Sequence, residues 1–186
     1  MRNNRSILPV GTVAYMNPLG WTFRMQFLAG FAGCVALLGY AIHTQLNDGL
    51  EPCPLCIFQR MAYMGLALVF LAGGLHAPRG VGGRRFYGVL VGLASLVGIG
   101  IAGRHVWLQL QPPGTAACGL PFSFMRETMG PMELVRKVLT GTGDCGTVDW
   151  TLFGLSMPVW SLVGFVLLAA WGLRAAFQRR RGRSRI

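Results

Sequence analysis

Four long apolar runs, separated by polar segments, are the feature that most limits what this chain can fold into. They extend from Met25 to Ile42, from Ile57 to Leu75, from Phe86 to Gly103 and from Thr151 to Leu173. Each run is close to the length of about 20 residues that a helix needs to cross the hydrocarbon core of a bilayer. Hydrophobic residues make up 53% of the chain, and the mean hydropathy is +0.49, which argues against a water-soluble globular domain. The sequence predicts an all-α fold, a polytopic membrane four-helix bundle.

We treat residues 1–186 as one membrane domain and predict its segments from these runs. The predicted spans are residues 21–42, 57–75, 86–107 and 155–174, joined by loops 43–56 and 108–154 and flanked by an N-terminal segment 1–20 and a tail 175–186. Both long loops carry cysteines. The fourth helix is expected to begin near Pro158, because proline is favoured in the first turn of a helix.

Charged residues are sorted between the segments that connect the spans. The 6 acidic residues all lie in the two cysteine-bearing loops, whereas arginines gather near the two chain ends and in the segment Arg79–Arg85. Lys and Arg are enriched on the cytoplasmic side of membrane proteins, so both termini are predicted to be cytoplasmic and both cysteine-bearing loops to lie on the outer face. This placement accounts for the net charge of +11. We therefore expect a lipid bilayer, and no nucleic acid, as the partner of the basic segments.

The motif Cys53-Pro54-Leu55-Cys56 lies where a polar loop meets the second apolar run. Cys56 is expected in the first turn of a helix, where unpaired N–H groups and the helix dipole favour a thiolate. This predicts thiol–disulfide chemistry at a membrane surface. The alternative is half of a zinc site, since Cys118 and Cys145 follow in the second loop, although an outer compartment favours disulfides. Four cysteines allow three pairings, of which Cys53–Cys56 is the local one.

Three further features have structural interpretations. Cys34 lies in the middle of the first run and is expected to be a small buried hydrophobe. The glycines of the third run permit close helix contacts. Residues Met132–Leu139 mix apolar and charged side chains at helical spacing, which predicts a short amphipathic helix that lies either in the membrane interface or against the end of the bundle.

Taken together, these residues resemble the disulfide bond formation protein B (DsbB) family. The resemblance covers nearly the whole chain after residue 20. It is carried by the four-span layout and by the following segments: Cys53–Cys56 with Arg60, His105–Leu110, Cys118, Gly143–Cys145 and Trp150–Pro158.

The resemblance implies an enzyme of the bacterial cell inner membrane, a protein-disulfide:quinone oxidoreductase. Such an enzyme reoxidises a DsbA-like thioredoxin-fold oxidase of the periplasm and passes the electrons to a membrane quinone, with ubiquinone favoured here over menaquinone. The cysteines that would be catalytic are Cys53, Cys56, Cys118 and Cys145. In the implied relay, DsbA attacks the Cys118–Cys145 disulfide at Cys118, Cys53 exchanges with the second loop, and Cys56 meets the quinone.

Three residues would serve the quinone, and no metal is expected. Arg60 lies one helical turn below Cys56 on the same face, where its charge would stabilise a thiolate and the developing quinol anion. Its alternative role is that of an arginine whose head group snorkels to the lipid head groups. His105 and Gln109 match family positions near the quinone, and their alternative role is interface anchoring.

Two other functions remain open from the sequence. The chain can be a non-enzymatic membrane adaptor or transporter subunit whose disulfides are structural. It can also belong to the vitamin K epoxide reductase-like family, another four-helix bundle with a Cys-X-X-Cys pair, but there the pair lies in the last span.

Overall fold

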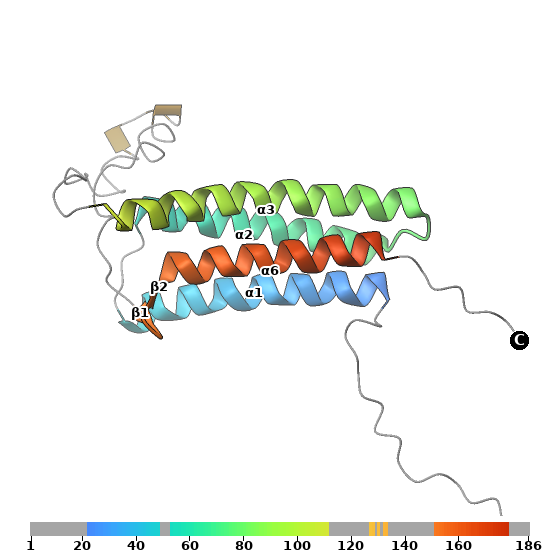
Figure 1. Cartoon of the computed structure of the whole chain (residues 1–186), viewed down its shortest axis with the longest axis horizontal. Helices are drawn as coiled ribbons and strands as arrows, with labels where there is room; N and C mark the ends of the chain where they lie inside the picture. Colours follow the sequence, from blue (N-terminus) through green and yellow to red (C-terminus); the bar gives the residue numbers. More distant parts are fainter. Residues whose placement is uncertain are drawn as a thin grey trace, which may run out of the picture.

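A computed structural model describes residues 22–48, 53–111, 127–128, 130, 132–133 and 151–178. Within these residues the elements are α1 (Phe23–Asp48), α2 (Pro54–His76), α3 (Val81–Gln109), β1 (Thr151–Leu152), β2 (Leu155–Ser156) and α6 (Met157–Phe177). The four helices are each long and apolar enough to cross a membrane. They lie side by side as an elongated bundle (Figure 1). The predicted all-α, four-helix membrane fold is confirmed.

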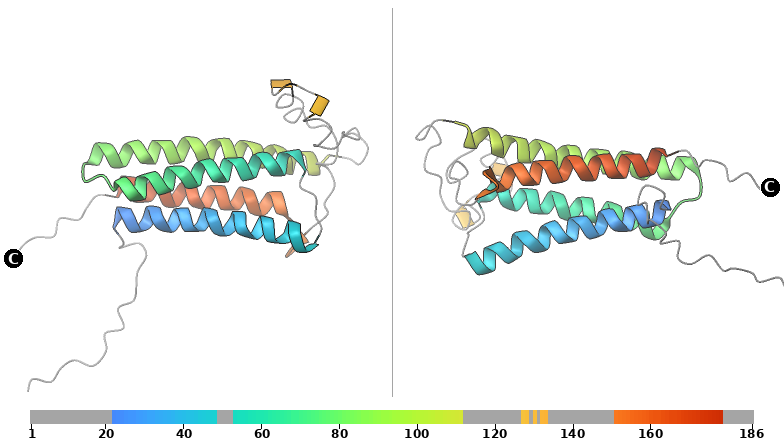
Figure 2. Two further views of the ribbon diagram at one scale, coloured as in Figure 1. Left: turned by 180° about the vertical axis from the view of Figure 1, so that it is seen from behind. Right: turned by 60° about the horizontal axis from the view of Figure 1, so that its bottom comes forward.

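The helices form a ring in which each has two principal neighbours. α1 packs against α2 and α6, and α3 packs against the same two helices, its contact with α6 being the most extensive in the bundle. The start of α2, the end of α3 and the β1–β2 hairpin share one end of the bundle, which we call the cysteine end (Figures 1 and 2). The opposite end holds the short connection between α2 and α3, and we call it the turn end.

The interior of the bundle is built around aromatic rings. Tyr63 and Phe165 are stacked with their ring centroids 3.9 Å apart, and Phe27 meets Phe70 edge to face at 5.3 Å. Many large apolar side chains instead face outward, among them Leu68, Leu96 and Leu167 with 65%, 64% and 63% of their surface exposed. An apolar outer surface of this kind is what a bilayer solvates and water does not.

Polar contacts near the turn end connect three of the helices. The Arg84 guanidinium donates to the carbonyl oxygens of Ala175 and Gln178, at 2.6 Å and 3.2 Å, where α6 ends. A cation at a helix C-terminus also interacts favourably with the helix dipole. The Trp171 indole N–H donates to the carbonyl oxygen of Gln26 at 2.8 Å. These bonds join α1, α3 and α6 at one level.

Two helices extend further than the sequence analysis expected. Residues 43–48, assigned to a loop, are the last turns of α1. They remain helical because no glycine or proline interrupts them before Gly49, and because the Asn47 side chain donates to the His43 carbonyl oxygen at 3.0 Å. Likewise α3 begins at Val81, inside the basic turn, with Gly80 as its N-cap residue. In these two helices the apolar run is therefore shorter than the helix that contains it.

The fourth span begins later than its apolar run. Residues 151–156 form an antiparallel hairpin in which Thr151 pairs with Ser156. Its central residues Phe153 and Gly154 have φ angles of 53° and 76°, as a type I′ turn requires. Helix α6 then starts at Met157 with Pro158 in its first turn, which confirms the expectation for Pro158.

Two predictions fall on residues that the structure does not describe. Of the expected amphipathic helix Met132–Leu139, only residues 132–133 are described, and both are helical. Cys118 and Cys145 lie outside the described residues altogether.

Close helix contacts occur at some glycines of α3 and not at others. A Cβ atom on Gly98 would overlap the ring of Phe165, and one on Gly88 would lie 2.5 Å from the Cβ of Ala176. A Cβ atom on Gly100 or Gly103 would meet nothing within 4 Å. The close contacts predicted for the glycines of this run therefore occur at Gly88 and Gly98, which lie against α6.

We predict that Gly98→Val lowers the thermal stability of the protein in detergent, whereas Gly100→Val does not. The valine side chain would collide with the ring of Phe165, which cannot rotate away because it is stacked on Tyr63. Overpacking of this kind costs about 1–3 kcal/mol. Gly100→Val is a matched control with the same change in helix propensity two residues along α3. Equal melting temperatures for the two variants would contradict the assigned α3–α6 contact.

Candidate functional site

Cys53 begins helix α2 and forms its N-terminal cap. Its backbone is extended, and its sulfur accepts a hydrogen bond from the backbone N–H of Cys56 at 3.3 Å. Pro54 follows as the first helical residue, where its fixed φ angle suits a helix and its missing N–H costs no bond. The Cys-Pro-Leu-Cys motif is therefore a helix start with a sulfur in place of the usual capping oxygen. The prediction that Cys56 lies in the first turn of α2 is confirmed.

The two sulfur atoms of the motif face each other at the cysteine end. The Sγ atoms of Cys53 and Cys56 are 2.9 Å apart, and both side chains are half-buried thiols rather than members of a disulfide. A disulfide bond has an S–S length of about 2.05 Å. The two sulfurs are therefore close enough to form a disulfide with little backbone movement.

A buried histidine from α3 completes this cluster. His105 has 2% of its surface exposed, and its Nε2 atom lies 3.7 Å from the sulfur of Cys53. Its Nδ1 atom lies 3.0 Å from the side-chain nitrogen of Gln59, which is 5% exposed. The three side chains form a polar row that crosses from α2 to α3 and back to α2. Each ring nitrogen of His105 therefore has a partner inside the bundle.

The row gives Cys53 an acid–base neighbour. When Nε2 carries a proton it can donate to a thiolate, and when it does not it can accept the proton of the thiol. Together with the N–H group of Cys56, His105 stabilises negative charge on the Cys53 sulfur. The same atoms can therefore support Cys53 both as a nucleophile and as a leaving group in disulfide exchange.

Arg60 lies one turn further along α2 and is bonded to α1. Its guanidinium donates to the side-chain oxygen of Gln45 and, at 3.0 Å, to the carbonyl oxygen of Ala41. These bonds use two of the five N–H donors of the group. Among the residues that the structure describes, the remaining donors have no partner. The half-buried charge therefore joins α1 to α2 and still has donors for a ligand.

Gln109 lies one turn beyond His105 on α3. Its side-chain oxygen accepts a hydrogen bond of 2.6 Å from the hydroxyl of Ser156, the N-cap residue of α6. Gln109 therefore joins the end of α3 to the start of α6. The structure brings Cys53, Cys56 and His105 together and places Arg60 and Gln109 about one turn away, at the same end of the bundle.

Sequence reasoning did not find two of the positioning side chains. Gln59 carried a signal, because it is a polar residue inside the second apolar run, but nothing in the sequence links it to a histidine 46 residues later. Gln45 fell in a segment expected to be a loop. Its contact with Arg60 depends on the extra turns of α1 and carries no sequence signal of its own.

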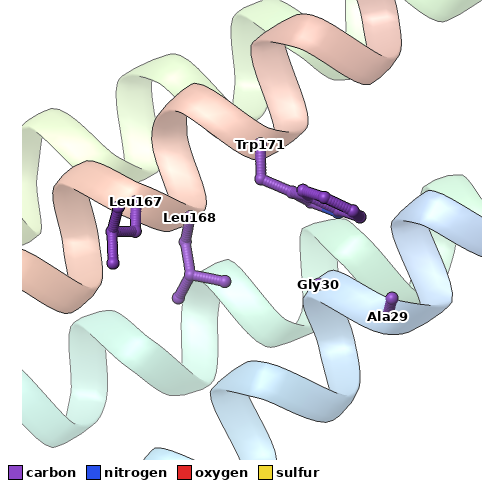
Figure 3. Close-up of a pocket in the computed structure, with 5 residues that line it drawn as sticks. All are labelled: Ala29, Gly30, Leu167, Leu168 and Trp171. Atoms are coloured by element: carbon purple, nitrogen blue, oxygen red, sulfur yellow. The ribbon is translucent and has the colours of Figure 1, made fainter. Parts of the chain in front are cut away.

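An apolar groove between α1 and α6 lies away from this cluster (Figure 3). Its lining residues are Ala29, Gly30, Leu167, Leu168 and Trp171. Gly30 is within about two turns of the start of α1, and Trp171 lies in the second half of α6, so the groove belongs to the half of the bundle near the turn end. It contains neither a thiol nor a charged side chain and is not the thiol site.

Comparisons with known proteins point to one family. Residues 23–175 match the family model described as disulfide bond formation protein DsbB. The chain is 61% identical over 166 residues to disulfide bond formation protein B of Xanthomonas campestris pv. campestris. The aligned region covers 89% of this chain and 96% of the relative. The protein of the same name from Xylella fastidiosa is 55% identical over 167 residues, covering 89% and 96% of the two chains.

We predict that His105→Ala slows alkylation of Cys53 at neutral pH. The substitution removes the nitrogen next to the sulfur, and loss of about 1 kcal/mol of thiolate stabilisation lowers the rate roughly fivefold. Gln59→Leu should give a smaller decrease, because it leaves the ring in place but removes its orienting contact. The rates are measured by mass spectrometry on Cys118→Ser/Cys145→Ser protein, with buried Cys34 as the internal unreactive thiol. Unchanged rates in both variants would contradict the Gln59–His105–Cys53 row.

Proposed function

This chain belongs to the disulfide bond formation protein DsbB family, and from that membership we propose that it is a protein-disulfide:quinone oxidoreductase of the bacterial inner membrane. Its partner is a DsbA-like thioredoxin-fold oxidase of the periplasm, which it returns to the disulfide form. The observation that carries this proposal is the position of Cys53. It caps helix α2 beside Cys56 and buried His105, at one end of a bundle of membrane-spanning length.

The proposed orientation places the cysteine end toward the periplasm and both termini in the cytoplasm. It is supported by the distribution of charge, since arginines gather near the chain ends and in Arg79–Arg85, while the acidic residues lie in the two other loops. In this orientation the pair on α2 and the second loop share a compartment with a soluble periplasmic partner.

The proposed chemistry is a series of thiol–disulfide exchanges. The partner dithiol loses two electrons and two protons, and the disulfide Cys118–Cys145 is reduced through a mixed disulfide at Cys118. A thiolate of the second loop then attacks Cys53 of the oxidised pair, so that the Cys53–Cys56 bond breaks and Cys56 leaves with the electron pair. When the second-loop disulfide forms again, Cys53 leaves as a thiolate. The Cys56 N–H group and His105 are placed to stabilise that charge and to supply its proton.

The residues at the cysteine end fit a quinone. A quinone bound there supplies an acceptor for two electrons and two protons, and its carbonyl oxygens require hydrogen-bond donors. Arg60 has such donors without partners among the described residues, one helical turn from Cys56. Arg60 would therefore hold the quinone, with His105 and Gln109 as the other candidates. We propose ubiquinone rather than menaquinone as this acceptor.

A non-enzymatic membrane adaptor with structural disulfides is the second candidate. It would use the cysteines only to fix loops. The arrangement at α2 favours the enzyme, because a structural disulfide has no need of a buried histidine beside one sulfur or of a half-buried arginine one turn away.

We predict that the purified protein reduces a short-chain quinone when supplied with a reduced DsbA-like partner. Cys118→Ala and Cys145→Ala should each abolish this turnover, because only the second loop is expected to receive electrons from the partner. Both variants should keep a Cys53–Cys56 pair that the quinone oxidises. The measurement follows quinone absorbance and the redox state of each pair. Partner-dependent turnover by either variant at low partner concentration would refute the relay.

We predict that Arg60→Lys already impairs quinone reduction, because an ammonium group cannot reproduce the planar set of guanidinium donors. Loss of a charge-assisted hydrogen bond costs about 1.5–3 kcal/mol, or roughly ten- to a hundredfold in rate or quinone affinity. Arg60→Ala should cost at least as much. Gln45→Ala is a useful comparison, since it removes one of the two contacts of Arg60 with α1 and keeps the charge.

Steady-state rates over a range of quinone concentrations separate two roles. A raised KM for quinone assigns Arg60 to binding, and a lowered kcat alone assigns it to the reaction. Wild-type kinetics in both Arg60 variants would make this residue a connection between α1 and α2 only.

A further inference from the structure

Three donor atoms at the cysteine end lie close enough together to bind one metal ion. The sulfurs of Cys53 and Cys56 and a ring nitrogen of His105 all lie within 4.8 Å of one another. Zinc binds sulfur and nitrogen at about 2.0–2.3 Å, so that tetrahedral donors lie about 3.5–3.8 Å apart. The separation of 3.7 Å between Cys53 and His105 already falls in this range. The two sulfurs, 2.9 Å apart, must separate by about 1 Å, which side-chain rotation allows.

The surroundings of the three donors also suit a metal ion. Metal-ligating histidines commonly have their second nitrogen held by another polar group, and Gln59 occupies that position at Nδ1 of His105. The Gln59 amide presents its nitrogen to Nδ1; when the amide is turned by about 180°, its oxygen accepts a hydrogen bond from the Nδ1 N–H group, and the Nε2 lone pair is then directed toward Cys53. Two donors come from the first turn of α2 and one from α3, so the donor set is carried by two packed helices. Both sulfurs are only half-buried, which leaves access to the site.

We propose that the reduced Cys53–Cys56 pair and His105 form a binding site for a thiophilic divalent cation, with Zn²⁺ as the expected ion. Two thiolates and an imidazole are a ligand set that zinc prefers, and three protein ligands leave a fourth position for water. The cation replaces the two thiol protons and changes no oxidation state. The site exists only while the pair is reduced, because a Cys53–Cys56 disulfide removes two of the three donors.

Occupation of this site would hold the pair in its reduced form. Neither sulfur of a zinc-bound pair is available for exchange. The cation would therefore inhibit the enzyme by holding its Cys53–Cys56 pair reduced. This consequence rests on the proposed function, whereas cation binding itself does not. Binding is therefore tested without the partner protein and without a quinone.

The experiment uses the full chain in detergent with Cys118→Ser and Cys145→Ser, so that the pair on α2 supplies the only accessible thiols. Cys34 is fully buried in the bundle and does not compete. Protein reduced with a phosphine is titrated with Co²⁺, whose thiolate complexes absorb visibly, and Zn²⁺ affinity is measured against a chromophoric chelator. We expect one ion per chain, displacement of Co²⁺ by Zn²⁺, and loss of binding after oxidation of the pair.

Variants at His105 decide whether the histidine is a ligand. His105→Ala should weaken Zn²⁺ binding at least tenfold, and His105→Cys should retain binding and strengthen the thiolate–cobalt absorption. The cysteine variant keeps the test decisive if the alanine variant fails to fold. Gln45→Ala is the matched control at the same end of the bundle and should bind Zn²⁺ as the parent protein does. Absence of binding in the parent, or parental affinity in His105→Ala, would overturn the proposal.

Discussion

The rest of this structure depends on the requirement that backbone N–H and C=O groups within lipid find their partners inside the protein. Long uninterrupted helices meet this requirement everywhere except at their ends. A helix N-terminus is the place where backbone N–H groups remain available for another acceptor. Cys53 is such an acceptor, because its sulfur takes the N–H group of Cys56 at the start of α2. The cysteine pair therefore lies at the end of a helix of membrane-spanning length, as a consequence of the same constraint that makes the chain helical.

The neighbour of that sulfur depends on packing far from the site. His105 reaches Cys53 only if α3 keeps its rotation against α2, since a shift of one residue turns a helical side chain by about 100°. The position of α3 is determined by its contact with α6, where Gly98 admits the ring of Phe165. The bond between Gln109 and Ser156 joins the same two helices at the cysteine end. Aromatic packing in the middle of the bundle thus controls the surroundings of a thiol at its end.

One set of side chains has both structural and chemical uses. Arg60 connects α2 to α1 through Gln45 and Ala41, and its remaining donors are available to a ligand. The Cys53 sulfur caps a helix and is also a candidate for disulfide exchange and for cation binding. These last two uses exclude each other, because a disulfide lacks the two thiolates that would bind a cation. The redox state of the pair consequently decides which chemistry the site can perform.

The sequence by itself determined the fold class, the position of Cys56 in the first turn of α2 and that of Pro158 near the start of α6, because hydropathy and proline geometry act locally. The Cys-X-X-Cys motif also identified Cys53 and Cys56 as candidate site residues, and resemblance to a family added Arg60, His105 and Gln109. Only the tertiary structure decided which of these residues meet. The contacts of His105 with Cys53 and with Gln59 join α3 to α2, and the bonds of Arg60 join α2 to α1. Such contacts depend on helix rotation and packing, which side chains distributed over the whole bundle determine together.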